Sequence, residues 1–85
     1  MAATTEVVRK AVEQVGALTS RDVEGVLGLH RNDDGWVVTV EIVELRRIPD
    51  STDVLASYEV SLDKSGELRE YRRTRRYARA SVEEV

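Results

Sequence analysis

The chain has 85 residues, of which 41% are hydrophobic and 34% are charged, and its formal net charge at pH 7 is −3. This length suits one domain with a thin core, because folding buries only about 63% of the surface of a chain of this size. The composition argues against both a disordered tail and a membrane protein. The sequence contains no cysteine, which excludes disulfide scaffolds, thiolate metal sites and cysteine nucleophiles.

The N-terminal segment has the three- and four-residue apolar spacing of an amphipathic helix. The apolar positions are Val7, Val8, Ala11, Val12, Val15 and Leu18. Thr4 or Thr5 can cap the first turn, and Gly16 with Thr19 and Ser20 marks the point where the pattern stops. We therefore predict a helix over about residues 5–18 with one apolar face.

After this helix the pattern changes to the two-residue alternation of β-strands, interrupted by turn formers. The predicted strands span about residues 22–31, 35–48, 54–63 and 66–79, followed by a frayed tail at 80–85. The first hairpin turn is encoded by Asn32, Asp33, Asp34 and Gly35, where the glycine can adopt a positive φ.

Two strands allow more detailed predictions. In the second strand Trp36 shares the phase of Ile42, which predicts that this tryptophan packs in the core. The apolar phase then changes between Ile42 and Val43, and we expect a bulge there to preserve one buried face. The third strand alternates cleanly from Val54 to Leu62, which predicts one packed side and one solvated side.

One helix followed by four strands with hairpin-length connections is an α+β order. We predict one domain over residues 1–85, in which the helix packs on one face of a four-stranded antiparallel β-meander. The shape resembles cystatin-like and PepSY-like domains, and this likeness of fold says nothing about function. The first and last strands of a meander are sheet edges, so either could accept a strand of another chain, including that of a second copy in a homodimer.

Residue types that carry enzyme or metal chemistry are scarce. His30 is the only histidine, and its position at a strand end is typical of a surface residue. Asp33 with Asp34, and Asp50 with Asp53, could contact a calcium ion, but turns favour aspartate for its local hydrogen bonds. We therefore predict no enzymatic activity, no cofactor and no metal.

Positive charge is concentrated in the last predicted strand. Between Arg69 and Arg79 six arginines accompany one acid, Glu70, so this segment carries +5 and the rest of the chain carries −8. By simple alternation Tyr71, Arg73, Arg75 and Tyr77 share one side of the strand, and Arg72, Thr74, Arg76 and Ala78 share the other. The predicted partner-binding residues are Arg46, Arg47, Tyr71, Arg72, Arg73, Arg75, Arg76 and Tyr77.

This strand allows three interpretations. Arginine and tyrosine are enriched at the centres of protein interfaces. Arginines also hold phosphates while tyrosines stack on bases, which would suit a nucleic acid, although the acidic chain argues against it. The arginines could instead form ion pairs across the sheet, and the glutamates available for this are Glu41, Glu44, Glu59 and Glu67.

Five segments carry a family resemblance. They are Val23 to Val26, Asp33 to Trp36, Val40 to Pro49, Asp53 to Val60 and Tyr71 to Tyr77. Together they resemble the gas vesicle protein O family over roughly residues 7–79, and the most distinctive part is the segment from Glu44 to Asp50, ELRRIPD. Members of that family often have a longer charged N-terminal extension than this sequence shows.

The resemblance implies a cytoplasmic, non-enzymatic accessory protein of gas vesicle formation. Such a protein would work with other gas vesicle accessory proteins, and with the shell protein as a further candidate partner, while the shell assembles. The start of the chain, Met1 to Val8, has no basic region followed by an apolar run, so we expect no secretory signal. The alternative function is a nucleic-acid-binding regulator that uses the last strand.

Overall fold

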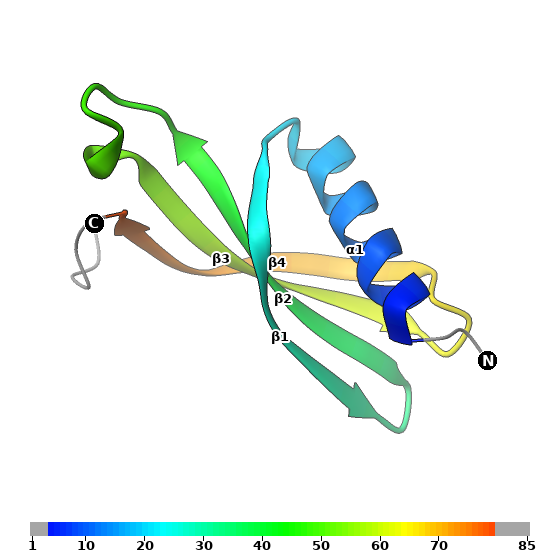
Figure 1. The fold of residues 1–85 in the computed structure, drawn as a ribbon. Helices are drawn as coiled ribbons and strands as arrows, with labels where there is room; N and C mark the ends of the chain where they lie inside the picture. The colour runs from blue at the N-terminus through cyan, green and yellow to red at the C-terminus, as the bar shows by residue number, and fades with distance from the viewer. Residues whose placement is uncertain (1–3, 80–85) are drawn as a thin grey trace.

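The structure is a computed structural model that describes residues 4–79. Its elements are α1 (Thr4–Thr19), β1 (Val23–Asn32), β2 (Gly35–Leu45), the 3-10 helix η1 (Asp50–Thr52), β3 (Val54–Asp63) and β4 (Leu68–Ala78). The four strands form one sheet in chain order, each antiparallel to the next, and α1 covers one of its faces (Figure 1). The predicted α+β meander is confirmed, while the predicted tail lies outside the described residues.

The core lies between α1 and the two central strands. Val7, Ala11 and Val15 are fully buried, and their four-residue spacing places them on one side of α1. They pack against the buried residues Trp36, Val38, Val40, Ile42, Val60 and Leu62. The prediction that Trp36 belongs to the core is confirmed, since the residue is only 6% exposed.

The second strand departs from its prediction in two ways. It ends at Leu45 and not near residue 48, because the amide of Arg47 turns away to donate a hydrogen bond to the carboxylate of Asp53. The bulge expected between Ile42 and Val43 is wrong, since both residues stay in regular register with β3 and the extra residue is Glu44. A bulge is not required to bury Val43, because this residue is already buried on the sheet face opposite α1, where it pairs with Leu55.

The third strand is also buried on more than one side. Residues 54–57 are all buried, and only the second half of β3 shows the predicted alternation. The expectation of one continuous solvated side is therefore wrong for the first half. At this end of the sheet the apolar residues Val43 and Leu55 give the sheet a second buried face away from α1.

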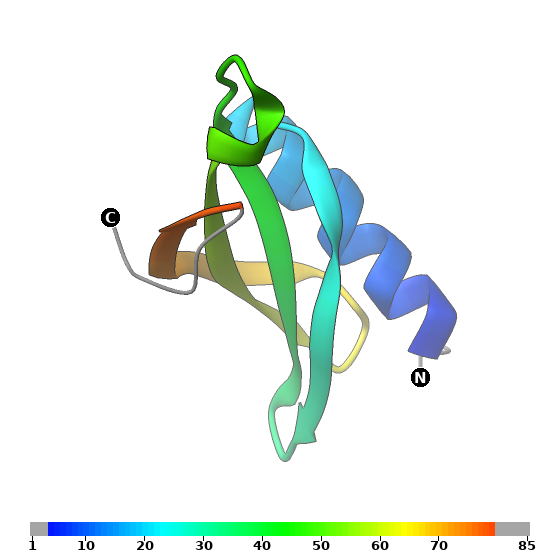
Figure 2. The ribbon, with the colours of Figure 1, turned by 60° about the vertical axis from the view of Figure 1, so that its left-hand side comes forward.

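Both edge strands contain extra residues. In β1 the residues without a partner in the register are Glu24 and Leu27, and in β4 they are Arg69 and Thr74. A bulge increases the local right-handed twist and bends the strand that contains it. The edges therefore follow a longer path than the central strands, and Figure 2 shows the strong twist of the resulting sheet.

The first hairpin depends on Gly35. This residue has a φ of 149°, and a Cβ atom there would lie 2.0 Å from the carbonyl oxygen of Leu62 on the neighbouring strand. We expect Gly35→Ala to lower the free energy of unfolding by about 2 kcal/mol or more, because the backbone would have to move. Urea unfolding followed by the fluorescence of Trp36 measures the loss.

Gly28→Ala is the matched control, since a Cβ atom at Gly28 meets nothing within 4 Å. We expect this change to stay within about 0.5 kcal/mol of the wild type. Equal losses from the two substitutions would contradict the steric argument for Gly35.

Candidate partner-binding surface

The bulge at Thr74 decides which side of the sheet each predicted residue of β4 occupies. Cross-strand partners share a face, so Tyr71 and Arg73, opposite Val60 and Tyr58, lie on the α1 side. After the extra residue the phase is reversed. The α1 side therefore holds Tyr71, Arg73 and Arg76, and the other side holds Arg72, Arg75 and Tyr77. The common side predicted for Tyr71, Arg73, Arg75 and Tyr77 is wrong.

On the α1 side, the carboxylate of Glu44 gathers the charged residues. Its side chain is only 9% exposed and pairs with Arg73 (Nη1 to Oε1, 3.1 Å) and Arg76 (Nε to Oε1, 3.3 Å). The hydroxyl of Tyr58 donates to the other oxygen at 3.3 Å, and burial, followed by the charge of Glu44, raises the pKa of Tyr58. Tyr71 packs against Tyr58 with the ring centroids 6.2 Å apart. These two arginines thus neutralise a nearly buried carboxylate.

On the opposite side the contacts are more open. Arg72 pairs with Glu59 across the strands at 3.1 Å, and its side chain is 73% exposed. The guanidinium of Arg75 lies 5.3 Å from the centre of the Tyr77 ring. The Tyr77 hydroxyl donates a hydrogen bond to Glu41, and burial, followed by this hydrogen bond, raises the pKa of Tyr77. Cross-strand pairing, one of the three interpretations of the arginines, therefore accounts for much of β4.

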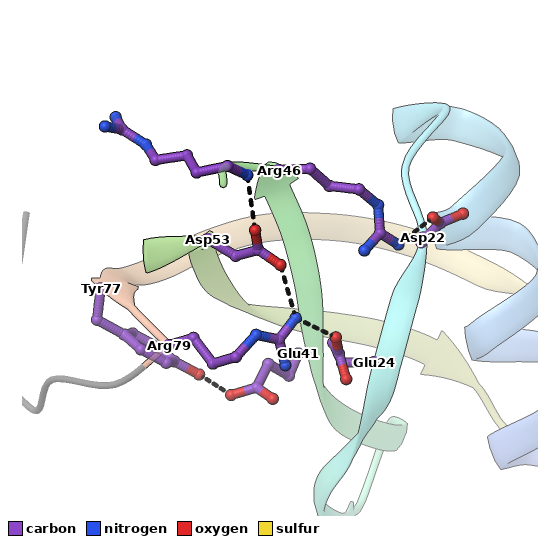
Figure 3. Close-up of polar contacts among 8 residues, drawn as sticks. Asp22, Glu24, Glu41, Arg46, Asp53, Tyr77 and Arg79 are labelled. Atoms are coloured by element: carbon purple, nitrogen blue, oxygen red, sulfur yellow. Dashed lines mark hydrogen bonds and ion pairs between the residues drawn. The ribbon is translucent and has the colours of Figure 1, made fainter. Parts of the chain in front are cut away.

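At the end of the sheet where β2 and β4 finish and β1 and β3 begin, Arg79, Asp53 and Glu24 form a network (Figure 3). One guanidinium nitrogen of Arg79 lies 3.0 Å from Asp53 Oδ2 and 2.5 Å from Glu24 Oε1. The other oxygen of Asp53 accepts the backbone N–H of Arg47 at 2.7 Å. The Arg79–Asp53–Glu24 network thus connects residues at the ends of all four strands.

The electrostatics of this network favour charged side chains. Asp53 is 1% exposed, and the hydrogen bonds from the Arg47 amide and from Arg79 hold the pKa of Asp53 below its ordinary value. The hydrogen bond from Arg79 likewise lowers the pKa of Glu24. A buried carboxylate is tolerated only when it is paired and hydrogen-bonded, and here both conditions are met.

The two predicted arginines that follow β2 differ from each other. Arg46 pairs with Asp22 at 2.5 Å, and this hydrogen bond raises the pKa of Arg46. The guanidinium of Arg47 makes no hydrogen bond or ion pair with any residue between 4 and 79, and the same holds for Arg69. Both residues are exposed. Within β4 and the loop between β2 and β3, Arg69 and Arg47 are the arginines whose guanidiniums have no partner among residues 4–79.

Sequence reasoning missed the Arg79–Asp53–Glu24 network. The sequence pattern predicts a turn at Asp53 and a basic strand that includes Arg79. A signal existed, since an antiparallel pairing of β3 with β4 places the residue before β3 beside the residue after β4. The amide of Arg79 does donate to the carbonyl of Asp53 at 2.8 Å. The contribution of Glu24 requires the β1 bulge, which the sequence did not reveal.

The other polar residues considered as sites have local roles. His30 is exposed, and the amide of Asp34 donates to the side chain of Asn32 at 3.0 Å, as expected for a turn. Between residues 4 and 79, no three His, Asp or Glu side chains are arranged so that they could hold a metal ion. In the same range, no helix combines the length and the apolar run needed to cross a membrane.

The network predicts a pH-dependent contribution to stability. Because the pKa values of Asp53 and Glu24 are lowered in the folded chain, their contribution is present above the ordinary values of 3.8 and 4.5 and is lost as the pH falls through the lowered values. We expect Arg79→Met to lower the free energy of unfolding at neutral pH. The difference from the wild type should shrink progressively below about pH 4.

Urea unfolding at a series of pH values measures this difference. Arg69→Met removes a guanidinium that lacks a described partner and serves as the control, with little effect expected at any pH. A deficit in Arg79→Met that stayed constant down to acidic pH would mean that packing of the arginine stem, and not its charge, matters.

Comparison with known proteins relates the sequence of this chain to one family. The family model described as "Gas vesicle synthesis protein GvpO" matches residues 1–83. Gas vesicle protein O of Streptomyces sp. (strain CB03234) is 51% identical over 73 residues, which are 86% of this chain and 57% of that protein.

Two further proteins are also similar. Gas vesicle protein O1 of Halobacterium salinarum is 35% identical over 75 residues, and gas vesicle protein O of Haloferax mediterranei is 34% identical over 76 residues. Each match covers 88% of this chain but only 63% and 54% of the two relatives, so the chain spans somewhat more than half the length of the relatives it matches. No solved structure matches the chain. With a family model that covers nearly its whole length, this chain belongs to the gas vesicle synthesis protein GvpO family.

Proposed function

We propose that this chain is a non-enzymatic accessory protein of gas vesicle formation that acts through contacts with other gas vesicle proteins. The description of its family supports the role in gas vesicle synthesis. The observation that supports contact through a surface is the exposure of β4, an edge strand on which every residue from Arg69 to Arg75 is exposed. We place the protein in the cytoplasm, with other accessory proteins and the shell protein as candidate partners.

The geometry separates two kinds of arginine on β4, and it adds the exposed Arg69, which is not among the predicted contact residues, as a candidate. Arg73 and Arg76 form ion pairs with Glu44, so their guanidiniums are already engaged within the chain. Arg72 is 73% exposed, and Arg69 points from a bulge with no described partner. Guanidiniums of this kind bind carboxylates in a bidentate manner, so an acidic segment of the partner would suit them.

No observation favours the nucleic-acid alternative. Stacking of bases requires free aromatic faces, but the Tyr77 ring carries Arg75 and its hydroxyl binds Glu41. Tyr71 packs against Tyr58. The tyrosines of β4 therefore offer less ring surface than the sequence pattern indicated.

The proposed contact surface is tested by charge reversal at Arg69 and Arg72. A reversal at Arg73 would place a second carboxylate beside Glu44 and damage the fold, so that position is avoided. We expect tagged wild type to recover gas vesicle proteins from cells that express a gas vesicle gene cluster. The double variant Arg69→Glu/Arg72→Glu should recover at least about tenfold less, because attraction becomes repulsion.

The matched control is Arg9→Glu/Lys10→Glu, which changes the net charge equally on the helix. It should leave recovery within about twofold of the wild type. Full recovery by the β4 double variant would rule out this surface. Recovery that disappears on nuclease treatment would instead support the nucleic-acid alternative.

A further inference from the structure

The loop between β2 and β3, residues 46–53, carries a fully exposed apolar side chain. Ile48 has a relative exposure of 101%, whereas the next most exposed large apolar residues, Leu27 and Leu18, reach 56% and 55%. Figures 1 and 2 show that this loop projects beyond the end of the sheet. A side chain in this position contributes nothing to the hydrophobic core of its own chain.

The backbone of the loop is nevertheless fixed on both sides of Ile48. Before it, the amide of Arg47 donates to Asp53 Oδ1 at 2.7 Å. After it, the carbonyl of Pro49 accepts hydrogen bonds from the amide of Thr52 at 3.0 Å and from its hydroxyl at 2.7 Å. The amide of Asp53 closes η1 by donating to the carbonyl of Asp50 at 2.9 Å.

The Arg79–Asp53–Glu24 network extends this bracing into the sheet. Asp53 holds the Arg47 amide with one oxygen and Arg79 with the other, and Arg79 reaches Glu24 on β1 (Figure 3). The residue just before Ile48 is therefore connected, through one buried carboxylate, to the two sheet edges. A loop that is already ordered loses little conformational entropy when it binds, which raises its affinity for a partner.

We propose that Ile48 is an anchor that inserts into an apolar pocket of a partner protein, and that carboxylates at the rim of this pocket pair with Arg47. The charge of Arg47 supports this partner chemistry, because its exposed guanidinium lies beside Ile48 in the sequence and has no ion pair among residues 4–79. Protein interfaces usually have an apolar core that is surrounded by a polar rim, and Ile48 with Arg47 matches this arrangement. The inference rests on the proposed function for the kind of partner, but it uses a part of the chain distinct from β4.

Site-specific photo-crosslinking tests the anchor directly. The full chain carries p-benzoylphenylalanine in place of Ile48, or in place of Leu27 as the control position, in cells that form gas vesicles. We expect position 48 to form an adduct with one gas vesicle protein, at an apolar segment flanked by Asp or Glu, and position 27 to lack this adduct. Adding Arg47→Glu to the same chain should lower the yield at least about tenfold.

Other crosslinking outcomes would overturn the inference. These are an adduct with lipid, an adduct with a second copy of the chain, adducts spread over many proteins, or no adduct at all. The Arg69→Glu/Arg72→Glu variant separates the two proposals. If this variant recovers fewer gas vesicle proteins but still forms the adduct at position 48, the β4 surface and the loop are two independent contacts. If the adduct forms and the charge reversal does not change the recovery, only the loop contact remains supported.

Purified partner identified by this adduct permits a quantitative comparison. Ile48→Leu should bind within about threefold of the wild type, while Ile48→Glu should bind at least about tenfold more weakly. Both variants should keep the wild-type melting temperature, because the side chain makes no contacts that support the fold. Arg79→Met should also weaken binding, although Ile48 is intact, because this change removes the support that Asp53 gives to the loop. Unchanged binding of Ile48→Glu would refute the anchor.

Discussion

The buried carboxylate of Asp53 is the interaction on which the rest of this structure depends. A charged group that is almost wholly removed from water is stable only when hydrogen bonds and an opposite charge replace the water. Asp53 satisfies this requirement with the amide of Arg47 and the guanidinium of Arg79. The same contacts end β2, hold the residue after β4 and fix the start of β3. The demand of one carboxylate thus positions three strand ends and the loop between two of them.

The acidic and basic residues of the chain act mainly as internal partners. Glu44 is held by Arg73 and Arg76, and Asp53 by Arg79. A domain of this size has a thin apolar core. At the ends of the sheet, where apolar contacts are few, hydrogen-bonded ion pairs fix the positions of the strands. Because Arg72, Arg73 and Arg76 pair with acidic residues of the chain, the unpaired positive charge on β4 is smaller than the sequence alone indicates. The candidate contact residues of β4 are instead distinguished by exposure: Arg72 is 73% exposed although it pairs with Glu59, and the exposed Arg69 has no partner among residues 4–79.

Much of the fold follows from patterns that act over short distances. The four-residue spacing of Val7, Ala11 and Val15 predicts the helix and its buried side, and the turn at Gly35 predicts the first hairpin. The side of each β4 residue was not predictable, because the extra residue at Thr74 shifts the phase. A bulge bends a strand and increases its twist. Its position depends on how the strand fits its neighbours in the assembled sheet, and the sequence of one strand does not contain this information. The role of Asp53 was hidden for the same reason, since its partners come from other strands.

The bulges of the edge strands have a consequence for self-association. An incoming strand needs an evenly spaced row of free N–H and C=O groups, and bulges interrupt such a row. In β1 the longest stretch without an interruption is Gly28–Asn32, and Thr74 divides β4 in its middle. Neither edge is therefore a good template for fibre growth by strand addition. The bulged edges therefore limit uncontrolled sheet extension, while the side chains of both edges stay accessible to solvent.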